Sequence, residues 1–471
     1  MESAVDRRAF TVLKTKKGVK EKMKRLLALL LAVLLVAGML AACNNNGGDP
    51  DPTPEPPPAD TPTPEPVDPN GGDEMPSGTL TVWCWDPNFN IFAMEEAARI
   101  YSAINPGFAI NIVDMGWDDI QTAFITAATA GTPDILPDIV LIQDNAFQMN
   151  VINFPELFLD ITGSGINFGE FAGGKVGMSM VNGRNYGVPF DNGAAITALR
   201  TDVLAEAGFT MADFTDITWN EFIERGSEVL AATGMPMLST EAGGGDFIAV
   251  MLQSAGVSLF NADGTPNIAD NPIIIEAINV YLELVSSGVL IEVNNWDEFV
   301  GSFVNGTVAG VLAGCWILGS VQSADDQAGN WGVMSIPRLN VAGGTQYSNW
   351  GGSSWAITTN ANAELAIDFM KHTFAGSVEL YEIILPAAGA LSTWLPAAGS
   401  PVYAEPQAFF GGQAVFGDIV RFAGGVPSVS TGVHFYEARD AVRFAVVDII
   451  GGADVETALR EAEELLIFQI G

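Results

Sequence analysis

Between residues 79 and 142 the sequence alternates regularly between strand-like and helix-like segments, and this order restricts the fold strongly. Residues 79–85, 108–113 and 139–142 are rich in the β-branched, aromatic and aliphatic side chains of buried strands. Two helix-like segments separate them, the first with Met94, Ala97, Ala98 and Tyr101 on one face and the second over residues 117–130. Strands joined through helices pair in parallel, so the sequence predicts an α/β fold with right-handed crossovers.

Polar and aromatic residues follow the first and third of these strands. Trp85 and Asp86 follow the first strand, and Asp144 and Asn145 follow the third. In parallel sheets, ligands bind beyond the carboxyl ends of the strands. We therefore expect these two clusters to border a binding site.

Two later segments carry clear helix signals. Thr218-Trp219-Asn220-Glu221 has the form of a capping box and predicts a helix that ends near Gly234. At the C-terminus an apolar stripe predicts an amphipathic helix that docks on the core. This stripe consists of Val455, Ala458, Leu459, Ala462, Leu465 and Leu466.

The N-terminal region has the pattern of an export signal. Four basic residues, at positions 20, 22, 24 and 25, precede an apolar run over residues 26–40. That run is shorter than the roughly 20 residues that a membrane-spanning helix needs. It closes with Leu40-Ala41-Ala42-Cys43, which resembles the lipobox of bacterial lipoproteins, where the cysteine sulfur carries diacylglycerol. We expect residues 1–42 to be a signal peptide, with Met1 or Met23 as the start, and Cys43 to be lipidated.

Residues 43–78 are predicted to form a tether. They are almost entirely Asn, Gly, Asp, Pro, Thr and Glu, and the motif Thr-Pro-Glu-Pro occurs twice. Such a segment buries little apolar surface, and its prolines hold it extended. At about 3.1 Å per residue it spans at most on the order of 100 Å. A domain carried on this segment stands away from the membrane surface.

The charge and the cysteines limit the partners. The first 42 residues hold nine Lys or Arg and three Asp or Glu, and the rest of the chain holds 11 against 53. Such an acidic surface repels nucleic acid and anionic lipid head groups. Besides Cys43 there are only Cys84 and Cys315, both in apolar strand-like surroundings. We expect buried free thiols there, with a disulfide as the alternative.

Several kinds of chemistry lack the residues they need. His372 and His434 are the only histidines, which argues against a His-based triad or a His-rich metal site. There is no phosphate-binding loop of the Walker type and no dinucleotide fingerprint. The sequence at 261–264 resembles the start of a calcium loop but lacks the downstream acid, so a tight turn is expected. We expect neither a cofactor nor a metal.

Seven phrases, in this order and spacing, resemble the extracellular solute-binding protein family 1, which includes sugar-binding subunits of ABC importers. They lie at 80–83 (LTVW), 137–140 (PDIV), 182–190 (NGRNYGVPF), 218–222 (TWNEF), 303–316, 351–357 (GGSSWAI) and 451–454 (GGAD). The resemblance implies a two-lobed, periplasmic-binding-protein-like α/β fold of type II. Each lobe would be a mostly parallel sheet flanked by helices, with the ligand cleft between the lobes.

The resemblance also implies the domain organisation. Lobe 1 is expected to comprise residues 79–190 and 351–394, and lobe 2 residues 191–350 and 395–471. The chain would cross between the lobes near 189–192, 348–352 and 391–395.

The function that the resemblance implies is solute capture rather than catalysis. The protein would be the extracellular solute-binding subunit of an ABC transporter. It would capture a sugar or oligosaccharide by hinge closure and deliver it to a membrane permease. It would act as a monomer on the outer face of the cell membrane, held by its lipid, or in the periplasm where an outer membrane is present.

A sugar offers hydroxyl groups and apolar C–H faces, so carboxylates, amides and tryptophans should converge in the cleft. The expected ligand-binding residues lie at strand ends or crossings, and Trp83, Trp219 and Trp355 are expected to pack in the core. Trp316 and Asp144 match family positions that often stack on sugar or bind its hydroxyls. Glu241 is expected to be a solvated loop acid, with a place in the cleft on the lobe 2 side as the alternative. The ligand-binding set is Trp85, Asp86, Asp144, Asn145, Asp191, Trp316, Trp350 and Trp394.

Three other functions remain open at this point. The acidic surface would suit a polyamine or another cationic solute, whose binding salt would weaken. A tethered glycoside-processing enzyme needs only two well-placed carboxylates. A surface adhesin would have neither a cleft nor a small ligand.

Overall fold

The computed structural model describes residues 75–261, 263–429 and 431–471. The predicted signal peptide, the predicted lipidation site Cys43 and the predicted tether up to residue 74 lie outside these residues. Within the described ranges, no helix combines the length and the apolar character that crossing a bilayer requires.

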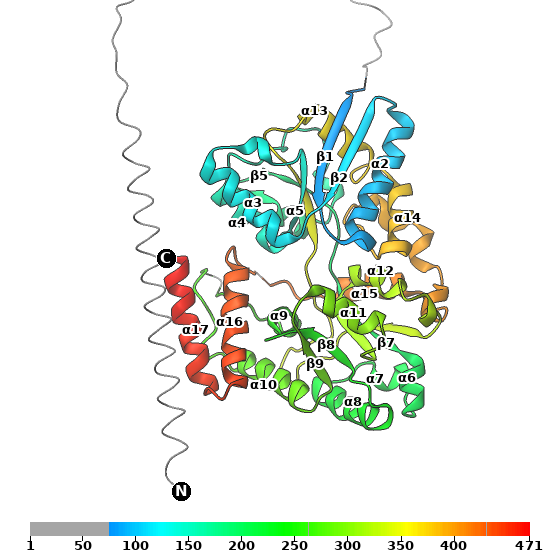
Figure 1. The fold of residues 1–471 in the computed structure, drawn as a ribbon, viewed down its shortest axis with the longest axis vertical. Coiled ribbons are helices and arrows are strands. Elements are labelled where there is room, and N and C mark those ends of the chain that lie inside the picture. The colour runs from blue at the N-terminus through cyan, green and yellow to red at the C-terminus, as the bar shows by residue number, and fades with distance from the viewer. Residues whose placement is uncertain (1–74, 262, 430) are drawn as a thin grey trace, which may run out of the picture. The chain divides into compact units, whose positions relative to one another are not determined.

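The first lobe is organised around a five-stranded sheet of order β2-β1-β3-β12-β6. Its paired strands β1 and β2 lie side by side in Figure 1. We call the part of the chain that surrounds this sheet lobe 1. β1 pairs in parallel with β2 and with β3, whereas β12 runs antiparallel to β3 and β6. The strands are β1 (Gly78–Cys84), β2 (Phe108–Asp114), β3 (Ile139–Gln143), β6 (Gly187–Pro189) and β12 (Ser353–Ile357). The predicted β-α-β-α-β unit is therefore confirmed, with strand ends shifted by one residue.

This sheet is buried on both faces, which explains its unbroken apolar strands. In β3, Ile139 and Leu141 pack into one core cluster, and Val140 and Ile142 pack into another on the opposite face. Successive side chains of a strand point to opposite faces, so each face contacts its own layer of helices. As predicted, α2 buries Met94, Ala97, Ala98 and Tyr101. The helices of lobe 1 are α2 (Phe92–Ile104), α3 (Trp117–Ala130), α4 (Asp144–Asn153), α5 (Gly173–Met178), α13 (Ala363–His372) and α14 (Val378–Ala388).

The second lobe has two small sheets, and we call the part around them lobe 2. One has the order β10-β7-β11 and is antiparallel throughout, and the other pairs β8 with β9 in parallel. The expectation of a mostly parallel sheet is therefore wrong for the larger sheet of lobe 2. The strands are β7 (Ala195–Arg200), β8 (Leu238–Glu241), β9 (Leu290–Val293), β10 (Gly310–Gly314) and β11 (Trp331–Met334). A strand-turn pair β4 (Met180–Val181) and β5 (Arg184–Asn185) completes the strands described.

The helices of lobe 2 surround these sheets, and α16 and α17 form the last part of the chain (Figure 1). Ala458, Leu459, Ala462 and Leu466 of α17 are buried as predicted, but Leu465 is exposed because it faces solvent beside the stripe. The helices are α6 (Thr201–Glu206), α7 (Met211–Phe214), α8 (Trp219–Thr233), α9 (Gly245–Ser254), α10 (Pro272–Ser286), α11 (Trp296–Val304), α12 (Leu318–Gln322), α15 (Val415–Gly424), α16 (Phe435–Ile450) and α17 (Val455–Ile470). Short helical turns lie at η1 (Asp86–Ile91), η2 (Pro133–Ile135), η3 (Phe168–Glu170), η4 (Cys315–Ile317), η5 (Asp325–Gln327), η6 (Leu395–Gly399), η7 (Pro401–Ala404) and η8 (Ala408–Phe410).

The predicted capping box at the start of α8 is present. Glu221 N donates to Thr218 Oγ1 at 3.3 Å, and Thr218 N donates to Glu221 Oε2 at 2.7 Å. We expect Thr218→Ala to lower the free energy of unfolding by about 1 kcal/mol, because it leaves a helix amide without its acceptor. Urea unfolding measures this. The control Thr122→Ala removes an exposed hydroxyl inside α3 and should leave stability unchanged, so equal losses would contradict the prediction.

Three segments of the chain pass between the lobes and lie against one another. The first joins β6 to β7, the second joins β11 to β12, and the third follows α14. Asn192 N donates to Leu391 O at 3.1 Å, and Trp350 N donates to Gly193 O at 2.7 Å. A Cβ on Gly193 would lie 2.2 Å from Trp350 O, so only glycine permits this close approach. Past the third predicted crossing, Ala397 still packs in the lobe 1 core.

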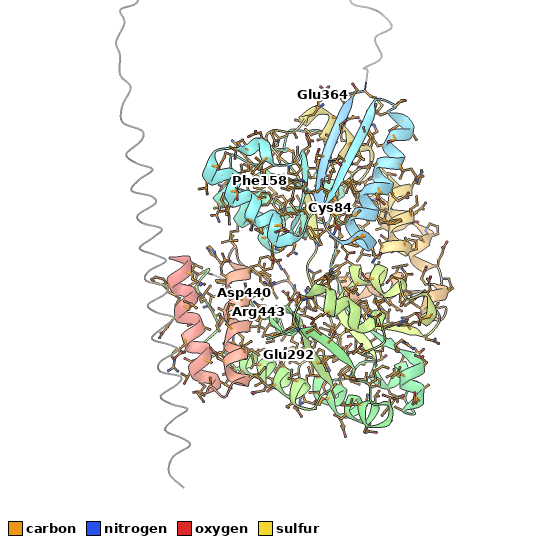
Figure 2. All side chains as sticks on the ribbon, in the orientation of Figure 1. Cys84, Phe158, Glu292, Glu364, Asp440 and Arg443 are labelled. Atoms are coloured by element: carbon orange, nitrogen blue, oxygen red, sulfur yellow. The ribbon has the colours of Figure 1, made fainter. Side chains whose placement is uncertain are left out.

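Cys84 and Cys315 are buried free thiols, as their apolar surroundings predicted. Cys84 lies in β1 of lobe 1 (Figure 2), and Cys315 lies directly after β10 of lobe 2. Cys315 Sγ lies 3.2 Å from Asn192 O, to which it can donate a weak hydrogen bond.

Candidate functional site

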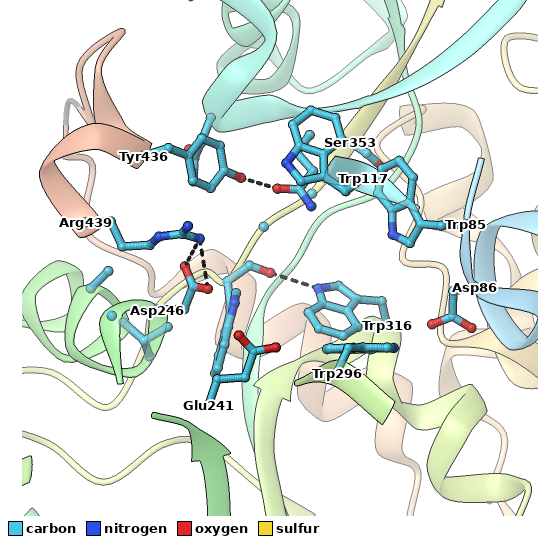
Figure 3. Close-up of a pocket in the computed structure, with 18 of the residues that line it drawn as sticks. Trp85, Asp86, Trp117, Glu241, Asp246, Trp296, Trp316, Ser353, Tyr436 and Arg439 are labelled. Atoms are coloured by element: carbon cyan, nitrogen blue, oxygen red, sulfur yellow. Dashed lines mark hydrogen bonds and ion pairs between the residues drawn. The ribbon is translucent and has the colours of Figure 1, made fainter. Parts of the chain in front are cut away.

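A cavity of about 1460 Å³ lies between the lobes, and both lobes line it (Figure 3). The lobe 1 wall is the carboxyl edge of the parallel strands. Trp85 and Asp86 follow β1, Asp114 ends β2, and Gln143 ends β3. Parallel strands direct their carboxyl ends to the same edge, so residues far apart in sequence meet here.

The backbone at Asp86 has a conformation that is uncommon for a residue with a side chain. Its φ is 67°, in the left-handed region. Asp86 Oδ1 accepts from Asn88 N at 3.0 Å, which stabilises the turn locally. Such backbone conformations cluster at ligand-binding sites.

Two tryptophan pairs line the cavity, one from each lobe (Figure 3). In lobe 1, the ring centroids of Trp85 and Trp117 are 5.6 Å apart. In lobe 2, those of Trp296 and Trp316 are also 5.6 Å apart. Trp316 Nε1 donates to Trp350 O at 2.9 Å, which fixes the orientation of the indole against the second crossing.

The lobe 2 wall adds charged groups. Asp246 of α9 accepts two hydrogen bonds from Arg439 Nη1 of α16, at 3.1 and 3.2 Å, and Asp440 accepts from Arg439 Nη2 at 2.9 Å. The Arg439 guanidinium also lies 4.6 Å from the ring centroid of Tyr436. Glu241 ends β8 and lines the cavity while remaining exposed, so it is solvated as expected but lies in the cavity.

Some buried polar atoms of the cavity-lining residues have no hydrogen-bond partner within the part of the chain that the structure describes. Among them are Asn90 Oδ1, Gln121 Nε2 and Arg443 Nε. Buried polar groups are normally paired, because an unpaired one costs about 1–3 kcal/mol. These atoms have almost no accessible surface, so in this arrangement of the side chains they offer no contact to a ligand in the cavity.

Two of the expected ligand-binding residues do not line the cavity. Asp144 is buried behind its wall, where it forms an ion pair with Lys175 of α5 and accepts from Ser354 Oγ at 3.0 Å. Trp394 packs in the lobe 1 core, and its Nε1 donates to Glu170 Oε2 at 3.3 Å. Their polar groups are already paired within the protein, so we remove both from the candidate set.

The other expected residues are at the cavity. Trp85, Asp86, Asn145, Asp191, Trp316 and Trp350 all line it. Asp191 differs from the rest because its Oδ1 accepts from Ser353 N at 2.8 Å and from Ser353 Oγ at 2.6 Å. These bonds join the first crossing to the start of β12, which indicates a structural role for this carboxylate where the chain passes between the lobes.

Burial raises the pKa of Asp191 to about 6, against the opposing effect of the Lys175 charge. An unfolded aspartate titrates near pH 3.9. Between about pH 4 and pH 6 the folded chain therefore keeps a proton that the unfolded chain has lost. The protonated Asp191 therefore stabilises the fold fully below about pH 4. This stabilisation decreases as the pH rises towards 6 and does not change further above that pH.

We expect Asp191→Asn to remove this pH dependence, because an amide has no proton to lose while its oxygen can still accept from Ser353. Relative to the native chain, the variant should gain on the order of 3 kcal/mol between pH 4 and pH 7. Urea unfolding across this range measures the difference. A difference that does not change with pH would show that Asp191 does not titrate in this window.

The residues that sequence reasoning missed are Trp117, Asp246, Trp296, Tyr436 and Arg439. Trp117 begins the helix directly after β2, so the strand-end rule could have found it. Trp296 begins α11, shortly after β9, a strand that was not predicted. Tyr436, Arg439 and Asp246 come together only through the packing of α16 on α9, and no local signal in the sequence marks them.

Among residues 75–471, apart from 262 and 430, no group of three or more His, Cys, Asp or Glu side chains is arranged to hold a metal ion.

Comparison with known proteins relates this geometry to a family. Residues 96–404 match the family model of bacterial extracellular solute-binding proteins. The chain is 38% identical over 395 residues to a lactose-binding protein of Rhizobium radiobacter, an alignment that covers 84% of this chain and 93% of that protein. It is 21% identical over 312 residues to an arabinooligosaccharide-binding protein of Halalkalibacterium halodurans, which covers 64% of this chain and 68% of that protein.

A solved structure supports the fold. The ABC transporter associated binding protein from B. animalis subsp. lactis Bl-04, solved in complex with β-1,6-galactobiose, superposes with a TM-score of 0.70 at 20% identity. The match covers 84% of this chain and 98% of that one. The predicted two-lobed α/β fold is thus confirmed. On the family model and the 38% identity over most of both chains, this protein belongs to the bacterial extracellular solute-binding proteins.

Proposed function

We propose that the protein captures a sugar or oligosaccharide outside the cell and delivers it to the permease of an ABC importer. The observation that carries this proposal is that two pairs of tryptophans face one cavity from opposite lobes. They are Trp85 with Trp117 and Trp296 with Trp316. Indole rings bind the apolar C–H faces of sugar rings. The carboxylates and amides that line the same cavity, among them Asp86 and Asn145, suit its hydroxyl groups. The similarity to a lactose-binding protein points to the same class of ligand.

The proposed mechanism is closure of the lobes around the solute. A ligand that contacts both walls stabilises the closed arrangement, since only there are both sets of contacts made. The permease would then recognise the closed form. We propose that the protein acts as a monomer and is held at the outer face of the membrane by a lipid on Cys43.

Thermal unfolding against a panel of solutes tests the ligand class. The panel should contain lactose, arabinooligosaccharides, other mono- and oligosaccharides, polyamines and amino acids. A bound solute at 100 times its Kd stabilises the fold by about 2.7 kcal/mol, which raises Tm by several degrees. A shift with one class of sugar, recovered chemically unaltered, supports binding without catalysis. A consumed sugar would instead indicate a glycoside-processing enzyme, and no shift with any sugar would remove the support for this proposal.

A cationic solute is the second candidate. The charged residues of the cavity lining include ten carboxylates but only two arginines, Arg439 and Arg443. Because Arg439 is paired with Asp246 and Asp440, the lining keeps a negative excess. Binding of a polyamine should weaken strongly between 50 and 500 mM salt, whereas binding of a neutral sugar should not change.

The lipid anchor has its own test. Cys43→Ser should abolish incorporation of radiolabelled palmitate and release the protein from the membrane fraction. Labelling of the serine variant at the native level would exclude Cys43 as the site.

A further inference from the structure

Tyr436 forms a contact between the lobes that does not belong to the three crossings. It lies in the first turn of α16 in lobe 2, and its hydroxyl donates to Gln143 Oε1 at the end of β3 in lobe 1 (Figure 3). The ring of Tyr436 also lies 6.5 Å from that of Trp117 in α3 of lobe 1. One side chain of lobe 2 thus makes a polar and an aromatic contact with lobe 1.

Lobe 2 holds Tyr436 in place by itself. Ala438 and Val442 of α16 are buried in the lobe 2 core. The Arg439 guanidinium lies over the Tyr436 ring, and Asp246 and Asp440 hold that guanidinium. The phenol is therefore positioned before lobe 1 contacts it.

The backbone that carries the acceptor is fixed within lobe 1. Gln143 is the last residue of β3, and its backbone pairs with Ser353 of β12. Its neighbour Asp144 begins α4, where Lys175 and Ser354 hold the Asp144 carboxylate. Because donor and acceptor both belong to rigid elements of different lobes, their hydrogen bond forms at one relative position of the lobes.

A bond that exists in only one arrangement shifts the population towards that arrangement. A hydrogen bond in a partly buried site changes such an equilibrium by about five- to tenfold. The contact with Trp117 adds to this preference, since it is lost at the same separation of the lobes.

We infer that Tyr436 is a latch residue, which fastens α16 of lobe 2 to the β3 edge of lobe 1 and favours the closed arrangement before any solute is bound. Its consequence for sugar affinity rests on the proposed function, but the latch itself does not. The latch raises the fraction of molecules that are closed, so losing it lowers the apparent affinity in proportion to the fall in that fraction.

The distance between the lobes in the absence of solute tests the latch directly. Spin labels on Ile125→Cys in α3 and Phe444→Cys in α16 report this distance by pulsed electron paramagnetic resonance, because both positions are exposed. Cys43→Ser prevents labelling at residue 43, and the buried Cys84 and Cys315 are protected. The native chain should give a narrow distribution. Tyr436→Phe, which keeps the ring and removes only the hydroxyl, should add a longer distance.

Two further variants make the result specific. Gln143→Leu removes the acceptor and should produce the same longer distance, and combining it with Tyr436→Phe should add nothing, because both break one bond. Tyr101→Phe is the matched control, since its hydroxyl donates to Asp368 at 2.6 Å within lobe 1 alone. Its distribution should equal the native one.

An unchanged distribution in Tyr436→Phe and Gln143→Leu would overturn the latch, as would a shift in Tyr101→Phe of equal size. Circular dichroism checks that each variant is folded. If Tyr436→Phe does not fold, Gln143→Leu still tests the hydrogen bond independently. These measurements use no sugar, so they stand apart from the ligand panel. Where the panel identifies a sugar, Tyr436→Phe should bind it more weakly by the factor by which the closed fraction falls in the distance distributions.

Discussion

Replacing Trp316 with alanine is expected to weaken binding of the sugar found in the ligand panel by about 100-fold. Trp316 lines the cavity, lies with its ring tilted against that of Trp296 and is oriented by its hydrogen bond to Trp350 O. Buried aromatic anchors of this kind account for about 2–4 kcal/mol of binding, and 2.7 kcal/mol corresponds to 100-fold. Isothermal titration calorimetry measures the loss. Trp316→Phe keeps an aromatic face but loses the orienting donor, so it should lie between the native chain and the alanine variant.

Trp83→Ala is the control for this experiment. Like Trp316, Trp83 is a partly exposed tryptophan, but it lies in β1 of lobe 1, packs against a core cluster there and does not line the cavity. Its removal should lower Tm without a change in affinity. If Trp316→Ala stays folded and binds the sugar as tightly as the native chain, the proposed stacking role of this ring is wrong.

Replacing Lys175 with methionine is expected to lower the free energy of unfolding by about 3–5 kcal/mol at pH 7. Lys175 is nearly buried and pairs with the buried Asp144. When the substitution removes the ammonium group, the Asp144 carboxylate keeps only the Ser354 hydroxyl as a side-chain partner. Breaking a buried ion pair from one side costs this much because it leaves an uncompensated charge. Urea unfolding gives the value. The deficit should shrink in acid, where protonation neutralises Asp144.

Two variants separate this effect from the simple loss of a charge. Arg421→Met removes an exposed ion pair with Asp418 and should cost less than 1 kcal/mol. The double variant Lys175→Met with Asp144→Leu replaces the pair with apolar groups and should recover most of the stability. Equal losses for Lys175→Met and Arg421→Met would mean that the buried pair does not matter to the fold.

Lys175 and Asp144 also show where sequence reasoning about the site went wrong. Asp144 directly follows a strand, and in this position a carboxylate commonly faces a ligand. Whether it does depends on α5, which brings Lys175 to it from 31 residues along the chain. The prediction of Trp394, made from its place at the third crossing, failed for the same reason. The burial of Trp394 depends on how that crossing packs against lobe 1.

Local patterns in the sequence determined the elements whose causes are themselves local. The apolar strands of lobe 1, the helix faces that cover them and the capping box of α8 depend on neighbouring residues, and the structure contains them as predicted. The polar residues after β1 and β3 could be placed because parallel strands must end at one edge.

Only the tertiary structure decided which of these side chains share a cavity. Trp296 and Trp316 meet because α11 packs against α12, which follows the turn that carries Trp316. Tyr436 reaches Gln143 from 293 residues away because α16 packs on α9. The antiparallel pairing of β7 with β10 and β11 was likewise invisible in the sequence, since strand direction depends on how the chain returns and not on the strand's own residues. Local propensities act over a few residues, whereas a binding site between two lobes is assembled from side chains that only long-range packing brings together.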